Sequence, residues 1–141
     1  MSHLFIRERR DSDLTILDLS RGSVDGFRKI IFGLALQRLI DMGQNQVVLN
    51  LAKVPYVDAA GLGELISARL RVSESGGQMK MCELSDRNLE LIALSGLISV
   101  FEIFENETLA TSSFQIRRHR RTIDRPSGYR GSSGRNSLRI F

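Results

Sequence analysis

Residues 47–70 read VVLNLAKVPYVDAAGLGELISARL, and this stretch decides the fold. It begins with the apolar run Val47 to Leu51, which is too short for a helix and rich in branched residues, as in a strand covered on both faces. After a second extended piece comes a tight turn at residues 58–61, Asp-Ala-Ala-Gly. Beyond the turn, four apolar residues recur at helical spacing: Leu62, Leu65, Ile66 and Leu70. We therefore predict a strand, a turn and a helix in direct succession.

The turn is the first place to look for function, because open α/β sheets place functional loops at the carboxyl ends of their strands. Asp58 is expected to cap the following helix by accepting a hydrogen bond from the Gly61 backbone N–H, and to interact favourably with the helix dipole. Direct contact of Asp58 with a partner is the alternative. Gly61 and Gly63 permit either close approach of a partner backbone or tight packing on the sheet.

The segments before this stretch indicate a hairpin and a helix. Residues 3–9 and 14–19 read as two short strands joined by a turn, which favours an antiparallel hairpin. A loop follows at residues 20–23. The next helix should start at residue 25 or 26 and continue to Met42, where Gly43 can end it in the left-handed conformation.

This first helix is apolar over more than the arc of about 100° that a helix needs to cover a sheet. One stripe consists of Phe27, Ile30, Ile31, Leu34, Ala35 and Met42, and a neighbouring face carries Phe32, Leu36 and Ile40. The surplus is explained either by a second core contact with another helix or by a protein-binding face. In the second case, helix 27–42 could join two copies of the chain in a homodimer.

The segments after the central stretch continue the alternation of strands and helices. We expect a strand at 78–84, a helix at 86–95, a last short strand within 97–104 and a terminal helix at 105–114. Ser85 should cap the helix at 86–95, and the terminal helix should face inward with Leu109, Ala110 and Phe114. This order favours a single α/β domain over residues 1–114, with a mixed sheet of four to five strands packed with about four helices.

The net charge of +4 comes from the C-terminal residues. Residues 115–141 hold eight arginines against Asp124 alone, whereas residues 1–114 carry 12 basic against 15 acidic side chains. A segment so poor in apolar residues cannot offset its ordering entropy, so we predict a disordered Arg-rich tail. It is either a solubilising extension or an electrostatic arm for nucleic acid, an anionic membrane surface or an acidic partner.

Several functional classes find little support in the sequence. No apolar run approaches the roughly 20 residues of a membrane span and the N-terminus lacks a signal-peptide pattern, which makes a cytoplasmic protein the expectation. Cys82 reads as a core residue, and His3 and His119 have no metal-ligand spacing, so no metal or cofactor is expected. No set of catalytic residues clusters around the turn, so we do not expect an enzyme.

The chain also resembles a known family through motifs that occur in a particular order and spacing. They are Val57-Asp58 followed by Gly61-Leu62-Gly63, the Gly76-Gly77 turn, and Leu94-Ser95-Gly96-Leu97 leading to Phe101 and Phe104. Over residues 4–114 the sequence is similar to a STAS domain of the bacterial anti-sigma-factor antagonist type. The resemblance implies a non-catalytic module that binds an anti-sigma factor, itself a serine kinase of the histidine-kinase-like ATPase type, and so releases a sigma factor for transcription.

In the family that this sequence resembles, the Asp of the turn precedes a Ser or Thr that the partner kinase phosphorylates. Here Ala59 and Ala60 stand at these positions, so the phosphoacceptor is lost. The residues expected to bind the partner are Asp58, Ala59, Ala60, Gly61 and Leu62, together with Arg21, Gly22 and Ser23 by resemblance alone. We infer a surface that binds constitutively or is regulated from elsewhere.

Three other functions remain open from the sequence. The domain could be the STAS scaffold of another signalling assembly. It could bind a nucleotide or anion through Gly61-Leu62-Gly63 at a helix N-terminus, although Ile66 replaces the third glycine of a dinucleotide fingerprint and no P-loop lysine follows. It could also bind nucleic acid through the Arg-rich tail.

Overall fold

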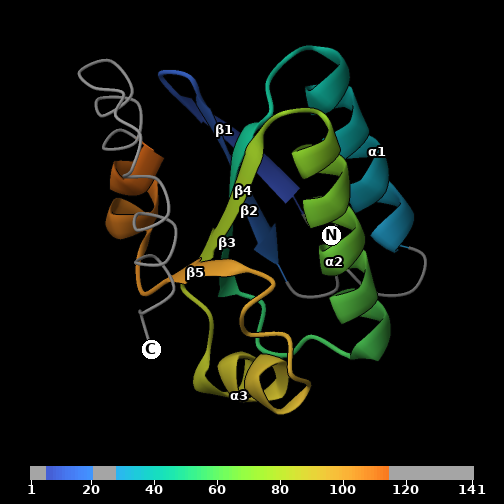
Figure 1. Ribbon diagram of the computed structural model, residues 1–141, viewed down its shortest axis with the longest axis vertical. Helices are drawn as coiled ribbons and strands as arrows, with labels where there is room; N and C mark the ends of the chain where they lie inside the picture. The colour runs from blue at the N-terminus through green and yellow to red at the C-terminus, as the bar shows by residue number, and fades with distance from the viewer. Residues whose placement is uncertain (1–5, 21–27, 115–141) are drawn as a thin grey trace, which may run out of the picture.

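The computed structural model describes residues 6–20 and 28–114, and the side chains of residues 6–20 and 31–114. A five-stranded sheet in the order β1-β2-β3-β4-β5 lies at its centre (Figure 1). The strands are β1 (Ile6–Asp11), β2 (Leu14–Ser20), β3 (Gln46–Lys53), β4 (Gln78–Cys82) and β5 (Glu102–Phe104). β1 runs antiparallel to β2, and all the other neighbours pair in parallel. The predicted hairpin and mixed α/β sheet are thus confirmed.

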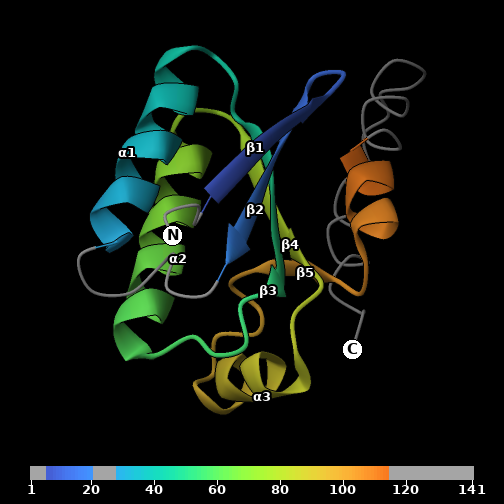
Figure 2. The ribbon, with the colours of Figure 1, turned by 180° about the vertical axis from the view of Figure 1, so that it is seen from behind.

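Helices cover both faces of the sheet. Helices α1 (Arg28–Asp41) and α2 (Ala59–Glu74) lie side by side on one face, and the helical residues 107–114 lie on the other (Figures 1 and 2). Helix α3 (Asp86–Leu94) lies at the end of the sheet where α2 begins. None of the described helices is long and apolar enough to cross a membrane. The predicted tail, residues 115–141, is outside the described residues.

The strands place alternate residues on the two faces, which gives two separate hydrophobic clusters. The larger cluster joins the sheet to the labelled helices and includes Leu17, Leu19, Val47, Leu49, Phe32, Leu36, Leu39, Leu65, Val72 and Ile92. The smaller cluster lies under residues 107–114 and consists of Leu14, Ile16, Val48, Cys82, Phe104, Ala110 and Phe114. Cys82 is buried as predicted, and burial raises the pKa of its thiol to about 12.

Local signals in the sequence set the ends of the helices. Gly43 has φ 77° directly after α1, a left-handed conformation that glycine adopts without strain, as predicted. Ser85 caps α3 as expected, because its side-chain oxygen accepts a 3.1 Å hydrogen bond from the Asn88 N–H. Helix termini are therefore specified locally in this chain.

Several apolar residues of the predicted helix patterns are exposed. Side chains that remain accessible are Ile31 (39%), Leu34 (67%), Met42 (53%), Leu70 (50%), Leu94 (80%) and Leu109 (45%). The prediction that Leu109 faces inward is therefore wrong, whereas Ala110 and Phe114 are buried as predicted. The first helix buries Phe32 and Leu36 and leaves Leu34 and Met42 of the predicted stripe uncovered. Phe27 and the side chain of Ile30 lie outside the described part.

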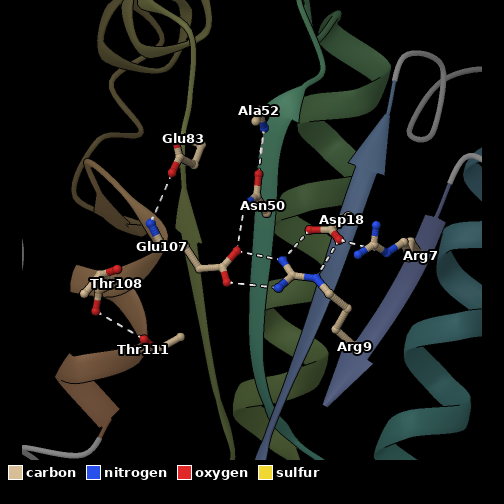
Figure 3. A network of polar contacts seen from close by, with 9 residues as sticks. All are labelled: Arg7, Arg9, Asp18, Asn50, Ala52, Glu83, Glu107, Thr108 and Thr111. Atoms are coloured by element: carbon tan, nitrogen blue, oxygen red, sulfur yellow. Dashed lines mark hydrogen bonds and ion pairs between the residues drawn. The ribbon is translucent and has the colours of Figure 1, made fainter. Parts of the chain in front are cut away.

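A polar network attaches the helical residues 107–114 to the sheet (Figure 3). Arg9 on β1 donates two 2.7 Å hydrogen bonds to Asp18 on β2, and bonds of 2.7 and 3.1 Å to Glu107. The Asn50 side chain on β3 donates a 2.8 Å hydrogen bond to Glu107 and accepts one of 2.9 Å from the Ala52 N–H. The hydrogen bonds from Arg9 hold the pKa of the Glu107 carboxyl below its ordinary value of 4.5.

Lys80 on β4 is a buried cation that the sequence pattern does not reveal. Its side chain is 2% exposed, and its Nζ lies 3.1 Å from a Glu102 oxygen and donates a 2.7 Å hydrogen bond to Ser113 Oγ. Nζ also lies 4.4 Å from the centroid of the Phe114 ring and 5.5 Å from that of Phe104. This partner set compensates the cost of burying the charge and attaches the C-terminal end of the 107–114 helix.

Candidate partner-binding site

The turn after β3 has the geometry that the sequence predicts. Asp58 is the N-cap of α2, in extended conformation, and its Oδ1 accepts a 2.8 Å hydrogen bond from the Gly61 N–H. The Asp58 carbonyl accepts the first bond of the helix from the Leu62 N–H at 2.9 Å. The first turn of α2 contains no acidic residue, and the Asp58 carboxylate at the N-cap interacts favourably with the positive end of the helix dipole.

The predicted partner-binding residues divide into exposed and supporting ones. Ala59 and Ala60 are exposed, and Asp58 is half-buried. Gly61 and Leu62, in the first turn of α2, are buried, so they shape the turn without presenting a side chain at the surface. Gly63 is exposed, and a Cβ placed there would meet no atom within 4 Å, so packing does not require a glycine at this position.

The second predicted segment, Arg21 to Ser23, lies outside the described residues. The strand before it ends at Ser20, which pairs with Lys53 at the end of β3 in a parallel register. Neighbouring parallel strands end at the same edge of a sheet. Ser20 and Lys53, the last residues of β2 and β3, therefore lie at one edge of the sheet.

A buried asparagine that the sequence analysis missed fixes the loop in front of the turn. Asn88 on α3 is 1% exposed. Its side chain accepts a 2.9 Å hydrogen bond from the Val57 N–H and donates one of 2.9 Å to the Val54 carbonyl. Loop and helix are therefore joined by two buried bonds. The available signal was a polar residue four positions before Ile92, on the same face of an otherwise apolar helix pattern.

Two further side chains beside the turn were also missed by the sequence analysis. Tyr56 in the loop is 54% exposed, and the guanidinium carbon of Arg87 on α3 lies 4.8 Å from the centroid of its ring. An aromatic residue two positions before the turn was a usable signal, but only the fold brings Arg87 next to it.

The exposed surface at the start of α2 is suited to contact with another protein. Its central groups are the methyl groups of Ala59 and Ala60, which can pack against a partner but supply no nucleophile, acid or base. One oxygen of the Asp58 carboxylate, Oδ1, is used in the helix cap. No group of three or more metal-ligating side chains occurs in the part of the chain that the structure describes.

Comparison with known proteins identifies the family of this chain. The sequence profile of the STAS domain matches residues 8–110 of the chain. The chain belongs to the STAS domain family. A Bordetella bronchiseptica relative named putative anti-sigma factor antagonist BtrV is 28% identical over 76 residues, which are 54% of this chain and 66% of the relative. The anti-sigma F factor antagonist of Paenibacillus polymyxa is 27% identical over 70 residues, covering 50% and 60%, and the anti-sigma-B factor antagonist of Bacillus subtilis is 28% identical over 82 residues, covering 58% and 74%.

The matches thus span less than two thirds of the first two relatives' own length.

Solved structures share the fold of this STAS domain. A putative anti-sigma factor antagonist from Thermotoga maritima superposes with a TM-score of 0.66 at 18% identity, covering 78% of this chain and 94% of that one. The Bacillus cell fate determinant SpoIIAA in its phosphorylated form gives 0.59 at 14% identity, covering 76% and 96%.

Proposed function

We propose that this STAS domain is a non-catalytic anti-sigma factor antagonist that binds an anti-sigma factor through the surface at Ala59 and Ala60. The observation that carries the proposal is the intact, capped and exposed turn in a chain whose relatives are named anti-sigma factor antagonists. The partner would be a serine kinase of the histidine-kinase-like ATPase type, and its release of a sigma factor would take place in the cytoplasm.

We further propose that phosphorylation at the turn does not switch this protein off. Neither Ala59 nor Ala60 has a hydroxyl group to accept a phosphate. A phosphate at the first residue of α2 would lie at the positive end of the helix dipole, so the free domain would tolerate it. Its effect would fall on the complex, where nearly two extra negative charges beside Asp58 would be desolvated. The alanines remove this means of control.

The test is a calorimetric titration of the full chain with each purified anti-sigma factor encoded in the same genome. Wild type and Ala59→Ser are expected to bind alike. Ala59→Glu is expected to bind at least about tenfold more weakly, because it places a charge in the contact. A glutamate in the first helical turn favours the fold, so lost binding would not reflect unfolding. Ser73→Glu adds the same charge at the exposed far end of α2 and serves as the matched control.

Incubation with the bound kinase and ATP tests the second part. Mass spectrometry should find phosphate at the turn in Ala59→Ser or Ala60→Ser, and the phosphorylated variant should lose affinity. Equal binding by wild type, Ala59→Ser and Ala59→Glu would refute the location of the surface. Binding without phosphate transfer to either serine variant would argue against a kinase partner.

A further inference from the structure

The Tyr56–Arg87 pair lies directly beside the proposed contact surface. Tyr56 precedes Asp58 by two residues, and Arg87 is the second residue of α3. Both loops leave the sheet at one edge, because β3 and β4 are parallel neighbours. This explains why α3 lies where α2 begins (Figure 1). The contact of 4.8 Å between guanidinium and ring is within the range of a cation–π interaction.

Arg87 keeps its hydrogen-bonding capacity in this arrangement. Within the described residues it forms no ion pair, and its exposed helix neighbours Asp86 and Glu90 make none with it. The tyrosine ring supports one side of the guanidinium plane, whereas the N–H donors lie along the edges of that plane. Such a group is ready to bind a carboxylate in bidentate geometry.

The pair is also held rigidly relative to the turn. Asn88, the neighbour of Arg87, forms two buried 2.9 Å hydrogen bonds with the loop that carries Tyr56. Helix α3 and the loop at residues 54–57 are therefore one unit. Groups that are already ordered lose little conformational entropy on binding, so a contact made here contributes efficiently to affinity.

An apolar side chain extends this surface along α3. Leu94 is 80% exposed, the largest exposed fraction among the large apolar side chains described. It lies seven residues, and so about two helical turns, after Arg87, which puts it on the same side of the helix. The exposed side of α3 therefore presents a cation beside an aromatic ring at one end and a leucine at the other.

We infer that Tyr56, Arg87 and Leu94 form a second contact for the same anti-sigma partner, which binds there with an acidic side chain on Arg87 and an apolar one near Leu94. This inference rests on the proposed function. Tyrosine and arginine are, with tryptophan, enriched among the residues that dominate binding energy at protein interfaces. Arg87, which forms no ion pair among the described residues, specifies a carboxylate on the partner. The connection through Asn88 makes turn and helix one recognition surface.

The test uses the full chain and the anti-sigma factor that shows the tightest binding in the titration above. Arg87→Ala and Tyr56→Ala should each weaken binding by about tenfold, and Leu94→Ala by a few-fold. Tyr56→Phe keeps the ring and should bind like wild type. Arg7→Ala removes another exposed cation, on β1, and Leu109→Ala an exposed leucine on the opposite face of the sheet, so both should stay within about twofold. Arg87→Ala should also reduce the dependence of affinity on salt.

The outcomes separate the two proposals. If Ala59→Glu abolishes binding while Arg87→Ala, Tyr56→Ala and Leu94→Ala stay within twofold, this inference is wrong and the proposed function stands. If no anti-sigma factor binds wild type, both fail. If the α3 variants change the sedimentation coefficient of the free protein but not its affinity for the anti-sigma factor, the surface joins two copies of the chain and the inference is again wrong.

Discussion

The backbone N–H of Val57 donates a 2.9 Å hydrogen bond to the side-chain oxygen of Asn88, 31 residues further along the chain. Asn88→Ala leaves this N–H and the Val54 carbonyl without partners in a buried site, which costs about 1–3 kcal/mol for each group. Urea unfolding should show this loss, whereas Arg87→Ala at the exposed neighbouring position should stay within about 0.5 kcal/mol of wild type. An unfolding free energy of Asn88→Ala equal to that of wild type would mean that this side chain does not fix the loop.

The Glu107 carboxyl gives stability a definite pH dependence. Its pKa in the folded protein lies below the ordinary value of 4.5, because Arg9 donates hydrogen bonds to it. As the pH falls below that value, the unfolded chain takes up more protons at this group than the folded protein, so acid favours unfolding. The stabilisation is present at neutral pH and is lost as the pH falls through the folded-state pKa.

Glu107→Gln should therefore flatten the decrease in unfolding free energy between about pH 5 and pH 3, measured by urea titration. Glu105→Gln, at an exposed position two residues earlier, should keep the wild-type slope. Equal slopes for all three proteins would show that the network of Arg9, Asp18 and Glu107 does not stabilise the fold.

The buried face of α1 can be tested with two leucines two positions apart. Leu36 is 0% exposed, so Leu36→Ala should cost about 2–5 kcal/mol of unfolding free energy. Leu34 is 67% exposed, so Leu34→Ala should cost less than about 0.5 kcal/mol. A larger loss of unfolding free energy for Leu34→Ala than for Leu36→Ala would mean that the face of α1 carrying Leu34, and not the face carrying Leu36, packs on the sheet.

Leu34→Glu tests the predicted homodimer. If the exposed face of α1 that carries Leu34 joins two copies of the chain, this variant should dissociate to monomers in sedimentation experiments.

The Cys82 thiol should be chemically inert in the folded protein. It is fully buried and its pKa is raised to about 12, so almost none is present as the reactive thiolate at about pH 8. Ellman's reagent should react with it only after unfolding in urea. Leu109→Cys introduces an exposed thiol, and that variant should show one immediate and one denaturant-dependent reaction. Immediate reaction of the wild type would contradict the burial.

The sequence by itself was sufficient for the local structure of this domain. A short apolar run rich in branched residues identified the central strand, because a strand covered on both faces is apolar on both. Gly43 and Ser85 marked the ends of helices, since a left-handed residue and a capping hydroxyl act within one helical turn. The Asp58 cap was predicted for the same reason, and the hydrogen bond from the Gly61 N–H confirms it.

Only the tertiary structure decided which side of each helix is covered. Helical spacing shows that apolar residues share a face, but the neighbouring elements determine whether that face is buried, which is why Leu70, Leu94 and Leu109 are exposed. The sequence likewise did not predict contacts between residues far apart in the chain. Arg9 donates a hydrogen bond to Glu107, 98 positions away, and Asn88 accepts one from Val57 in the loop before the turn. The capped turn at Asp58 is thus specified locally, whereas its support and the Tyr56–Arg87 pair beside it exist only because two parallel strands end at one edge of the sheet.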